Sequence, residues 1–156
     1  MAEKSGFDPL ELPESNTTSY PEPYRTMAKR RWNRRLAAHA GLTIFGVNLT
    51  RIEPGGLSSQ RHTHTAQDEF VYVLEGEVEL VTDAGPETLR TGMCAGFPAG
   101  TGNAHHFVNR SDRDVLLLVV GDKTAGDEVV YTDIDLHGRL GDDGRVVFTK
   151  KDGSPV

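Results

Sequence analysis

Two histidines one residue apart, His62 and His64, constrain the fold of this chain more than any other feature. Residues i and i+2 of a β-strand share a face, so an extended chain here directs both imidazoles to one place, which a helix would not do. Glu69 follows and opens the apolar run 70–74, so its carboxylate can lie beside the two rings. Nitrogen and carboxylate ligands together suit zinc, iron, manganese, nickel or copper.

A second histidine pair supplies a candidate for a fourth ligand. His105 and His106 lie at the start of another predicted strand. Adjacent residues of a strand point to opposite faces, so only one of the two can point inward. We choose His105 as the ligand and place His106 on the other face.

Residues 56–76 have the pattern Gly, five residues, His-x-His, four residues, Glu, six residues, Gly. This pattern resembles the first motif of the cupin superfamily at every fixed position. A second stretch resembles the second cupin motif at Gly92, Pro98, Gly100, His105 and Asn109. It departs from that motif in one place, because four residues separate Gly100 from His105 where two are usual. The chain is thus similar to the small single-domain cupins of bacteria.

The resemblance implies an all-β fold, namely a double-stranded β-helix (jelly-roll-like) barrel, here with an N-terminal arm. Main strands are expected at 42–53, 69–74, 77–82, 86–90, 94–97, 104–108 and 114–120, with a short helix at 34–40 that Gly41 ends. We divide the chain into an N-terminal arm with a basic stretch (1–41), the barrel core (42–121) and a C-terminal extension that packs on the barrel (122–156). Within the arm, residues 1 to about 24 are expected to be loosely held.

The same resemblance places one divalent transition metal inside one mouth of the barrel, held by His62, His64, Glu69 and His105. Buried together without a metal, these four groups would cost several kcal/mol of desolvation or would shift their pKa values. We therefore favour a metal site over four separate structural roles. A barrel that kept its ligands and lost its metal is the alternative.

Length and composition bound the class of protein. A chain of 156 residues forms one domain, and 37% hydrophobic with 26% charged residues is typical of a soluble globular protein. No apolar run is long enough to span a membrane, and residues 1–15 show no secretory signal. The single cysteine, Cys94, is expected to be a small buried side chain and fits a reducing compartment, so we expect a cytoplasmic protein.

The charge of the chain is unevenly distributed. Six cations and no acid lie between residues 25 and 35, although the net charge is −6. This stretch is either an anion-binding or nucleic-acid-binding patch, or a solvated arm whose arginines pair with acids of the barrel. The acidity of the rest of the chain favours the second interpretation, and we expect no nucleic-acid partner and no membrane partner. The acidic segment 121–135 is interpreted as solvated turns.

Four protein ligands leave one or two positions open on a metal, where a water or a small oxygenated metabolite can bind. We therefore expect a metal-dependent enzyme of dioxygenase, isomerase or lyase type, or alternatively a non-catalytic module that binds a metal or small molecule. A metal-free structural protein is a third possibility. No second titrating group is placed by a motif, so the catalytic residues are not identified. Barrel edges need covering, and we expect a homodimer.

Overall fold

The computed structural model describes residues 5–141 and 145–156. In that part of the chain the strands are β1 (Arg31–Arg35), β2 (Phe45–Ile52), β3 (His62–His64), β4 (Glu69–Glu75), β5 (Glu77–Thr82), β6 (Gly85–Arg90), β7 (Cys94–Phe97), β8 (His106–Val108), β9 (Val115–Asp122), β10 (Glu128–Tyr131), β11 (His137–Leu140) and β12 (Val146–Thr149). The helices are short: η1 (Pro9–Glu11), α1 (Tyr24–Met27), η2 (Ala28–Arg30) and α2 (Leu36–His39). The prediction of an all-β fold is confirmed.

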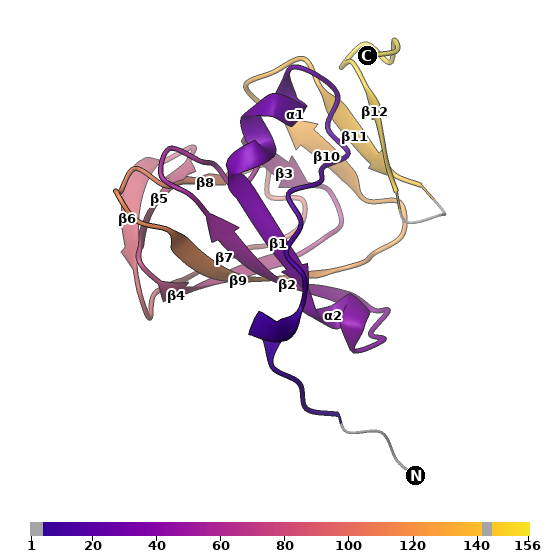
Figure 1. Ribbon diagram of the computed structural model, residues 1–156. Coiled ribbons are helices and arrows are strands. Elements are labelled where there is room, and N and C mark those ends of the chain that lie inside the picture. The colour runs from indigo at the N-terminus through magenta and orange to yellow at the C-terminus, as the bar shows by residue number, and fades with distance from the viewer. Residues whose placement is uncertain (1–4, 142–144) are drawn as a thin grey trace.

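The strands form two layers that close into a barrel (Figure 1). One layer is a five-stranded sheet in the order β1-β2-β9-β4-β7. The other layer consists of a three-stranded sheet, β6-β5-β8, and a four-stranded sheet, β12-β11-β10-β3. Backbone bridges join these two smaller sheets, since Leu57 pairs with Val108 and His62 pairs with His105.

Alternation along β4 decides which side chains enter the barrel. Val71 and Val73 are fully buried, whereas Phe70, Tyr72 and Leu74 between and beyond them are exposed. The inward residues join a core between the five-stranded and three-stranded sheets, made by Ile52, Val71, Val73, Val78, Leu80, Leu89, Phe107, Val115 and Leu117. Burial of each such side chain stabilises the fold by about 1.5–3 kcal/mol. Apolar packing therefore fills this end of the barrel and leaves the end near β3 for polar groups.

A glycine makes the tight connection from β4 to β5. Gly76 has φ +88°, in the left-handed region that disfavours residues with a Cβ. A Cβ at this position would also lie 3.0 Å from the carbonyl oxygen of Asp114. Both conformation and space therefore require glycine at this turn.

The N-terminal segment packs more tightly than expected. Ser15 pairs with Asn33 of β1 through two backbone hydrogen bonds, of 2.9 and 3.1 Å. Tyr20 is only 6% exposed, and its ring lies 5.7 Å from that of Tyr131 and 5.5 Å from that of Phe148. The expectation of a loosely held arm is therefore wrong for residues 15–20.

Three local predictions are corrected by strand pairing. The helix expected at 34–40 is limited to α2, because residues 31–35 pair with β2 as β1. The acidic segment 121–135 is not only turns, since β10 lies within it and pairs with β3. Cys94 is exposed at the start of β7, an edge strand, and not buried. The domain boundaries after residues 41 and 121 stay a prediction.

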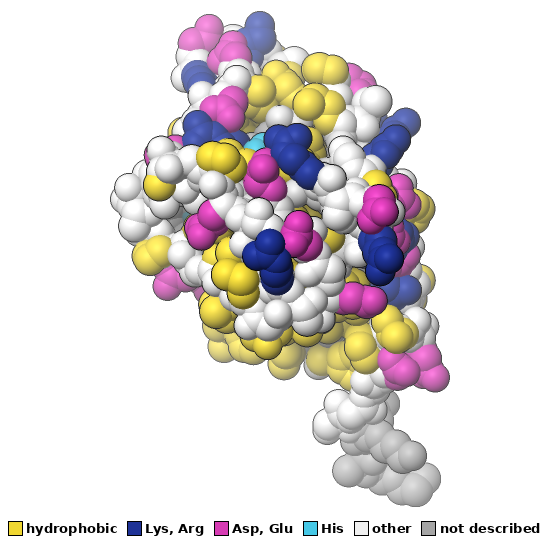
Figure 2. All heavy atoms as spheres, turned by 90° about the vertical axis from the view of Figure 1, so that its left-hand side faces the viewer, with side chains coloured by type: hydrophobic (Ala, Val, Ile, Leu, Met, Phe, Trp, Pro, Cys, Tyr) yellow, Lys and Arg dark blue, Asp and Glu magenta, His cyan; other side chains and the backbone are white. Residues whose placement is uncertain are grey.

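Exposed apolar side chains mark the outer face of β4 and its neighbours. Phe70, Tyr72, Leu74 and Met93 are each between 36% and 43% exposed. Hydrophobic side chains gather along the lower side of the molecule in Figure 2, where Figure 1 shows the five-stranded sheet.

None of the helices in the described ranges is long and apolar enough to cross a membrane. The cytoplasmic location stays a prediction.

Candidate metal centre

His62 and His64 occupy the two ends of the three-residue strand β3. The strand is held on one side by β10, where Tyr131 pairs with His62 and Val129 with His64. Because the two histidines are two residues apart on a strand, their rings lie on one face, and their Nε2 atoms are 3.1 Å apart. The paired strand thus fixes both rings within one small volume.

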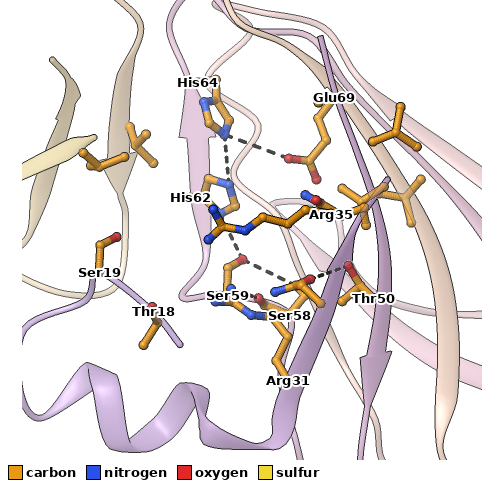
Figure 3. A pocket seen from close by; sticks show the side chains of 18 of the residues that line it. Thr18, Ser19, Arg31, Arg35, Thr50, Ser58, Ser59, His62, His64 and Glu69 are labelled. Carbon is orange, nitrogen blue, oxygen red and sulfur yellow. Dashed lines mark hydrogen bonds and ion pairs between the residues drawn. The ribbon is translucent and has the colours of Figure 1, made fainter. Parts of the chain in front are cut away.

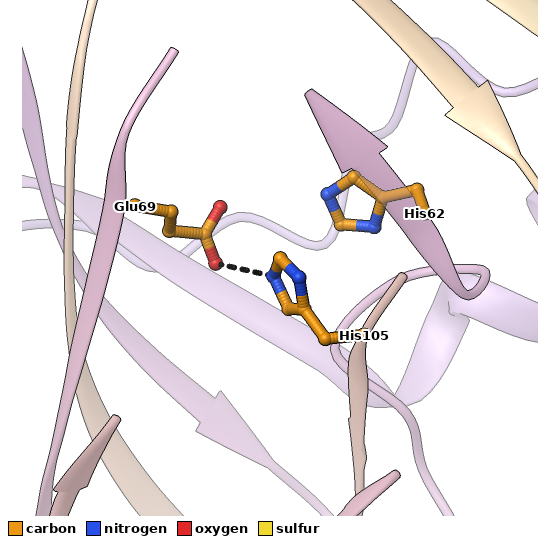
Figure 4. A group of neighbouring side chains, drawn as sticks. All are labelled: His62, Glu69 and His105. Atoms are coloured by element: carbon orange, nitrogen blue, oxygen red, sulfur yellow. Dashed lines mark hydrogen bonds and ion pairs between the residues drawn. The ribbon is translucent and has the colours of Figure 1, made fainter. Parts of the chain in front are cut away.

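Glu69 and His105 approach the same volume from two other segments (Figure 4). Glu69 is the first residue of β4, and its Oε1 lies 3.2 Å from His105 Nε2. The His105 backbone exchanges hydrogen bonds of 2.8 and 3.1 Å with that of His62. One potential ligand atom from each of His62, Glu69 and His105 lies within 4.8 Å of the others. The His64 Nε2 is 4.0 Å from Glu69 Oε2.

Hydrogen bonds orient two of the rings. The Nδ1 atom of His62 lies 2.9 Å from the carbonyl oxygen of Gln60, which can only accept, so Nδ1 carries the hydrogen. The His64 Nδ1 lies 2.6 Å from Asp127 Oδ2 and donates to it in the same way. Both Nε2 atoms then carry their lone pairs toward the shared volume, as metal-binding histidines do.

His105 is oriented differently. Its ring stacks on Phe97, with centroids 3.5 Å apart and planes inclined by 5°. His105 is 2% exposed, and its Nδ1 is buried with no hydrogen-bond partner among the described residues. Packing, and not an acceptor for Nδ1, therefore holds this ring. His106 lies apart from the group, with its Nδ1 3.2 Å from the carbonyl oxygen of Ser59.

The surroundings of His62 and Glu69 shift the pKa values of both side chains. Burial lowers the pKa of His62 to about 4, so this ring is neutral at neutral pH. Burial alone would raise the pKa of Glu69, but the hydrogen bond with His105 and the nearby histidine rings outweigh it and hold that pKa below its usual range. A neutral imidazole and an ionised carboxylate are the forms that bind a metal.

The chemistry of this donor set fits a divalent transition metal. Two Nε2 lone pairs that face each other at 3.1 Å repel unless a proton or a cation lies with them. Three imidazoles and one carboxylate supply ligands that zinc, iron, manganese, nickel and copper accept. His62, Glu69 and His105 could therefore hold such an ion, with His64 beside them.

Asp127 is the residue at this centre that sequence reasoning missed. It is 3% exposed, and besides His64 it accepts hydrogen bonds from the backbone N–H groups of Ala66 and Gln67, at 2.9 and 3.1 Å. Sixty-three residues separate it from His64, and only the β3–β10 pairing brings them together. The apolar residues that follow it were the one signal of a strand in this segment.

The centre opens on a cavity of about 540 Å³ (Figure 3). His62, His64 and Glu69 line one wall, and residues of β1, β2 and the segment 17–20 line the others. Gly100, which precedes the two extra residues of the second motif, donates its backbone N–H to the carbonyl oxygen of His64 at 2.9 Å. The longer loop is thereby tied to the strand that carries the histidines.

Comparison with known proteins places this fold and site in a family. A family model described as a cupin domain matches residues 48–121. A crystal structure from Silicibacter pomeroyi, described as a sugar phosphate isomerase from a cupin superfamily, is 42% identical, with a TM-score of 0.92. The match covers 97% of this chain and 96% of that one. This protein belongs to the cupin superfamily.

Other known proteins are similar over less of the chain. Germin-like protein subfamily 2 member 4 of Arabidopsis thaliana is 41% identical over 68 residues, which are 39% of this chain. The matched segment spans 30% of that plant protein's length. The polyketide cyclase RemF of Streptomyces resistomycificus has a TM-score of 0.63 at 24% identity, covering 78% of this chain and 80% of that one, and shows the shared fold alone.

Replacement of Asp127 by Asn tests how the second histidine of the cupin centre is oriented. Asn keeps the shape but lacks the charge, and its amide can present a donor to His64 Nδ1. We expect metal affinity to fall about 10- to 100-fold, as is usual when a carboxylate behind a metal-binding histidine is lost. Competition with a metal-binding dye measures the affinity. Asp133→Asn, in the exposed ion pair with Arg61, is the control. Equal affinity in Asp127→Asn and wild type would contradict this role.

Proposed function

We propose that this cupin is a metal-dependent isomerase of a small sugar-like compound that carries a carbonyl group beside a hydroxyl group. The observation that carries the proposal is the convergence of His62, Glu69 and His105, with His64 beside them. Three of these residues, His62, His64 and Glu69, line a cavity of about 540 Å³. The similarity over 97% of the chain to a protein described as a sugar phosphate isomerase supports the reaction class.

In this proposal His62, His64, Glu69 and His105 bind one divalent ion of zinc, iron, manganese, nickel or copper. When bound, the ion supplies Lewis-acid chemistry, because it polarises carbonyl and hydroxyl oxygens. The reaction moves one hydrogen from the hydroxyl-bearing carbon to the carbonyl carbon and another between the two oxygens. Its atoms balance without an oxidant or a reductant.

The chain's own residues must hold and move the proton. Glu69 is the only acid among the described residues that line the cavity. Its lowered pKa keeps it ionised at neutral pH, so the carboxylate oxygen that does not bind the metal can accept a proton. Glu69, His62 and His64 line the cavity together, so a substrate bound there would lie next to all three side chains.

Proton exchange tests the reaction class directly. We expect the metal-loaded protein to interconvert an aldose and its ketose, and to incorporate deuterium from heavy water at the carbon beside the carbonyl, both followed by NMR. A chelator should abolish the signal, and His64→Ala should reduce the rate at least 100-fold. His137→Ala is the control, since His137 lies on β11 and pairs with Glu128. Saturable ligand binding without exchange or product, under every metal, would instead favour a non-catalytic binding module.

We also propose that a second copy of this chain covers the outer face of β4. Phe70, Tyr72 and Leu74 form a row there, next to Met93, and soluble monomers rarely expose contiguous apolar patches of this kind. Sedimentation should give twice the chain mass of 17.1 kDa. Tyr72→Glu should shift the mass toward the monomer, whereas Val147→Glu, at an exposed position of β12, should not. A wild-type mass of 17.1 kDa would refute the dimer.

A further inference from the structure

The basic stretch of the sequence divides between two faces of the barrel wall. Residues 31, 33 and 35 share one face of β1, and all three line the cavity. The residues between them face outward, where Trp32 donates its indole N–H to Glu53 and Arg34 pairs with Glu14 at 2.6 Å. The expectation that arginines of this stretch pair with acids therefore holds for Arg34 but not for the residues that face the cavity.

Arg31 brings a partly buried cation to the cavity, and none of the ion pairs among the described residues includes it. One guanidinium nitrogen donates to the carbonyl oxygen of Ser58 at 2.6 Å, which is a neutral acceptor. Its Nε is buried and has no hydrogen-bond partner in the described part of the chain. Burial lowers the pKa of Arg31, although the guanidinium keeps its charge at neutral pH. A buried charge is costly unless it is paired, so an anion that enters the cavity gains a strong interaction here.

Arg35 lies on the same face, two positions from Asn33. Figure 3 shows its side chain extending from β1 across the cavity, in the direction of His62. It is exposed, and no acid in the described ranges pairs with it. Hydroxyl groups complete the surroundings, because the cavity lining includes Thr17, Thr18, Ser19, Ser58 and Ser59. Phosphate groups in proteins are commonly bound by arginine guanidinium groups together with hydroxyl donors.

The net charge of the cavity lining also favours an anionic ligand. Arg31, Arg35 and Lys123 face a single acid, Glu69, among the described residues of the cavity wall. We propose that Arg31 and Arg35 form an anion-binding subsite of the cavity that holds the phosphate of a phosphomonoester, while the metal centre receives the carbonyl end. This inference rests on the proposed function for the second end of the substrate, but the subsite itself can be tested without turnover.

Calorimetric titration with inorganic phosphate tests the subsite on the protein as purified. We expect saturable binding, weakened about tenfold or more in Arg31→Gln and in Arg35→Gln, since each loses a charge-assisted hydrogen bond. Arg35→Gln is the safer variant, because Arg35 is exposed and its side chain makes no hydrogen bond or ion pair with the described residues. Lys29→Gln removes one charge from the same basic stretch, at an exposed position outside the cavity lining, and should bind phosphate as the wild type does.

Three results would overturn the subsite: no phosphate binding by the wild type, equal affinity in all variants, or acetate binding as tightly as phosphate, which would indicate a carboxylate ligand. Metal content should be the same in every variant. Phosphate binding that depends on Arg35, with no isomerisation of any phosphorylated sugar, would refute the proposed function and leave the subsite standing. Isomerisation of an unphosphorylated sugar with KM unchanged in Arg35→Gln would refute the subsite and leave the proposed function standing.

Discussion

The backbone pairing of β3 is the interaction on which the rest of the site depends. This strand of three residues is hydrogen-bonded to β10 on one side and to the backbone of His105 on the other. The first pairing positions Asp127 behind His64, and the second brings His105 next to His62. A slip of one residue in either register would turn one set of side chains to the opposite face. The geometry of the centre is therefore a consequence of strand register more than of side-chain packing.

The two ends of the barrel have different energetic roles. Apolar residues fill the end between the five-stranded and three-stranded sheets, and their burial stabilises the fold. The other end gathers groups that are costly to bury, such as a neutral histidine of lowered pKa and an arginine whose buried Nε has no hydrogen-bond partner among the described residues. Such costs are typical of functional sites, because a ligand that enters can offset them. Both observations concern one cavity, which links the metal centre to the cationic wall opposite it.

Much of the fold and part of the centre could be predicted from the sequence, because they depend on local patterns. The strands from β4 to β9 could be predicted from alternating or apolar runs that are separated by turns rich in glycine. The spacing of His62, His64 and Glu69 likewise predicts a shared face without any tertiary information. Asn109, the last matched position of the second motif, has a structural role, since its amide donates to the carbonyl oxygens of Ile52 and Arg113.

What the sequence could not give depends on pairing between distant segments. Asp127 lies in an acidic segment whose composition is typical of solvated turns. Only the pairing of β10 with β3 brings it to His64. Arg31 and Arg35 stood in a run of cations whose period-2 pattern was masked by Arg30 and Arg34. Burial of Tyr20 in the N-terminal segment likewise follows from contacts with β10 and β12, which composition does not reveal.

Elemental analysis of the untagged protein, beside the His62→Ala/His64→Ala double variant, tests the central claim most directly. The account predicts about one equivalent of zinc, iron, manganese, nickel or copper in the wild type and its loss in the variant. His39→Ala, a histidine packed against Phe7 and away from the centre, should keep the metal. Substoichiometric metal in the wild type, even after reconstitution, would contradict the account and mean that these ligands no longer serve a metal.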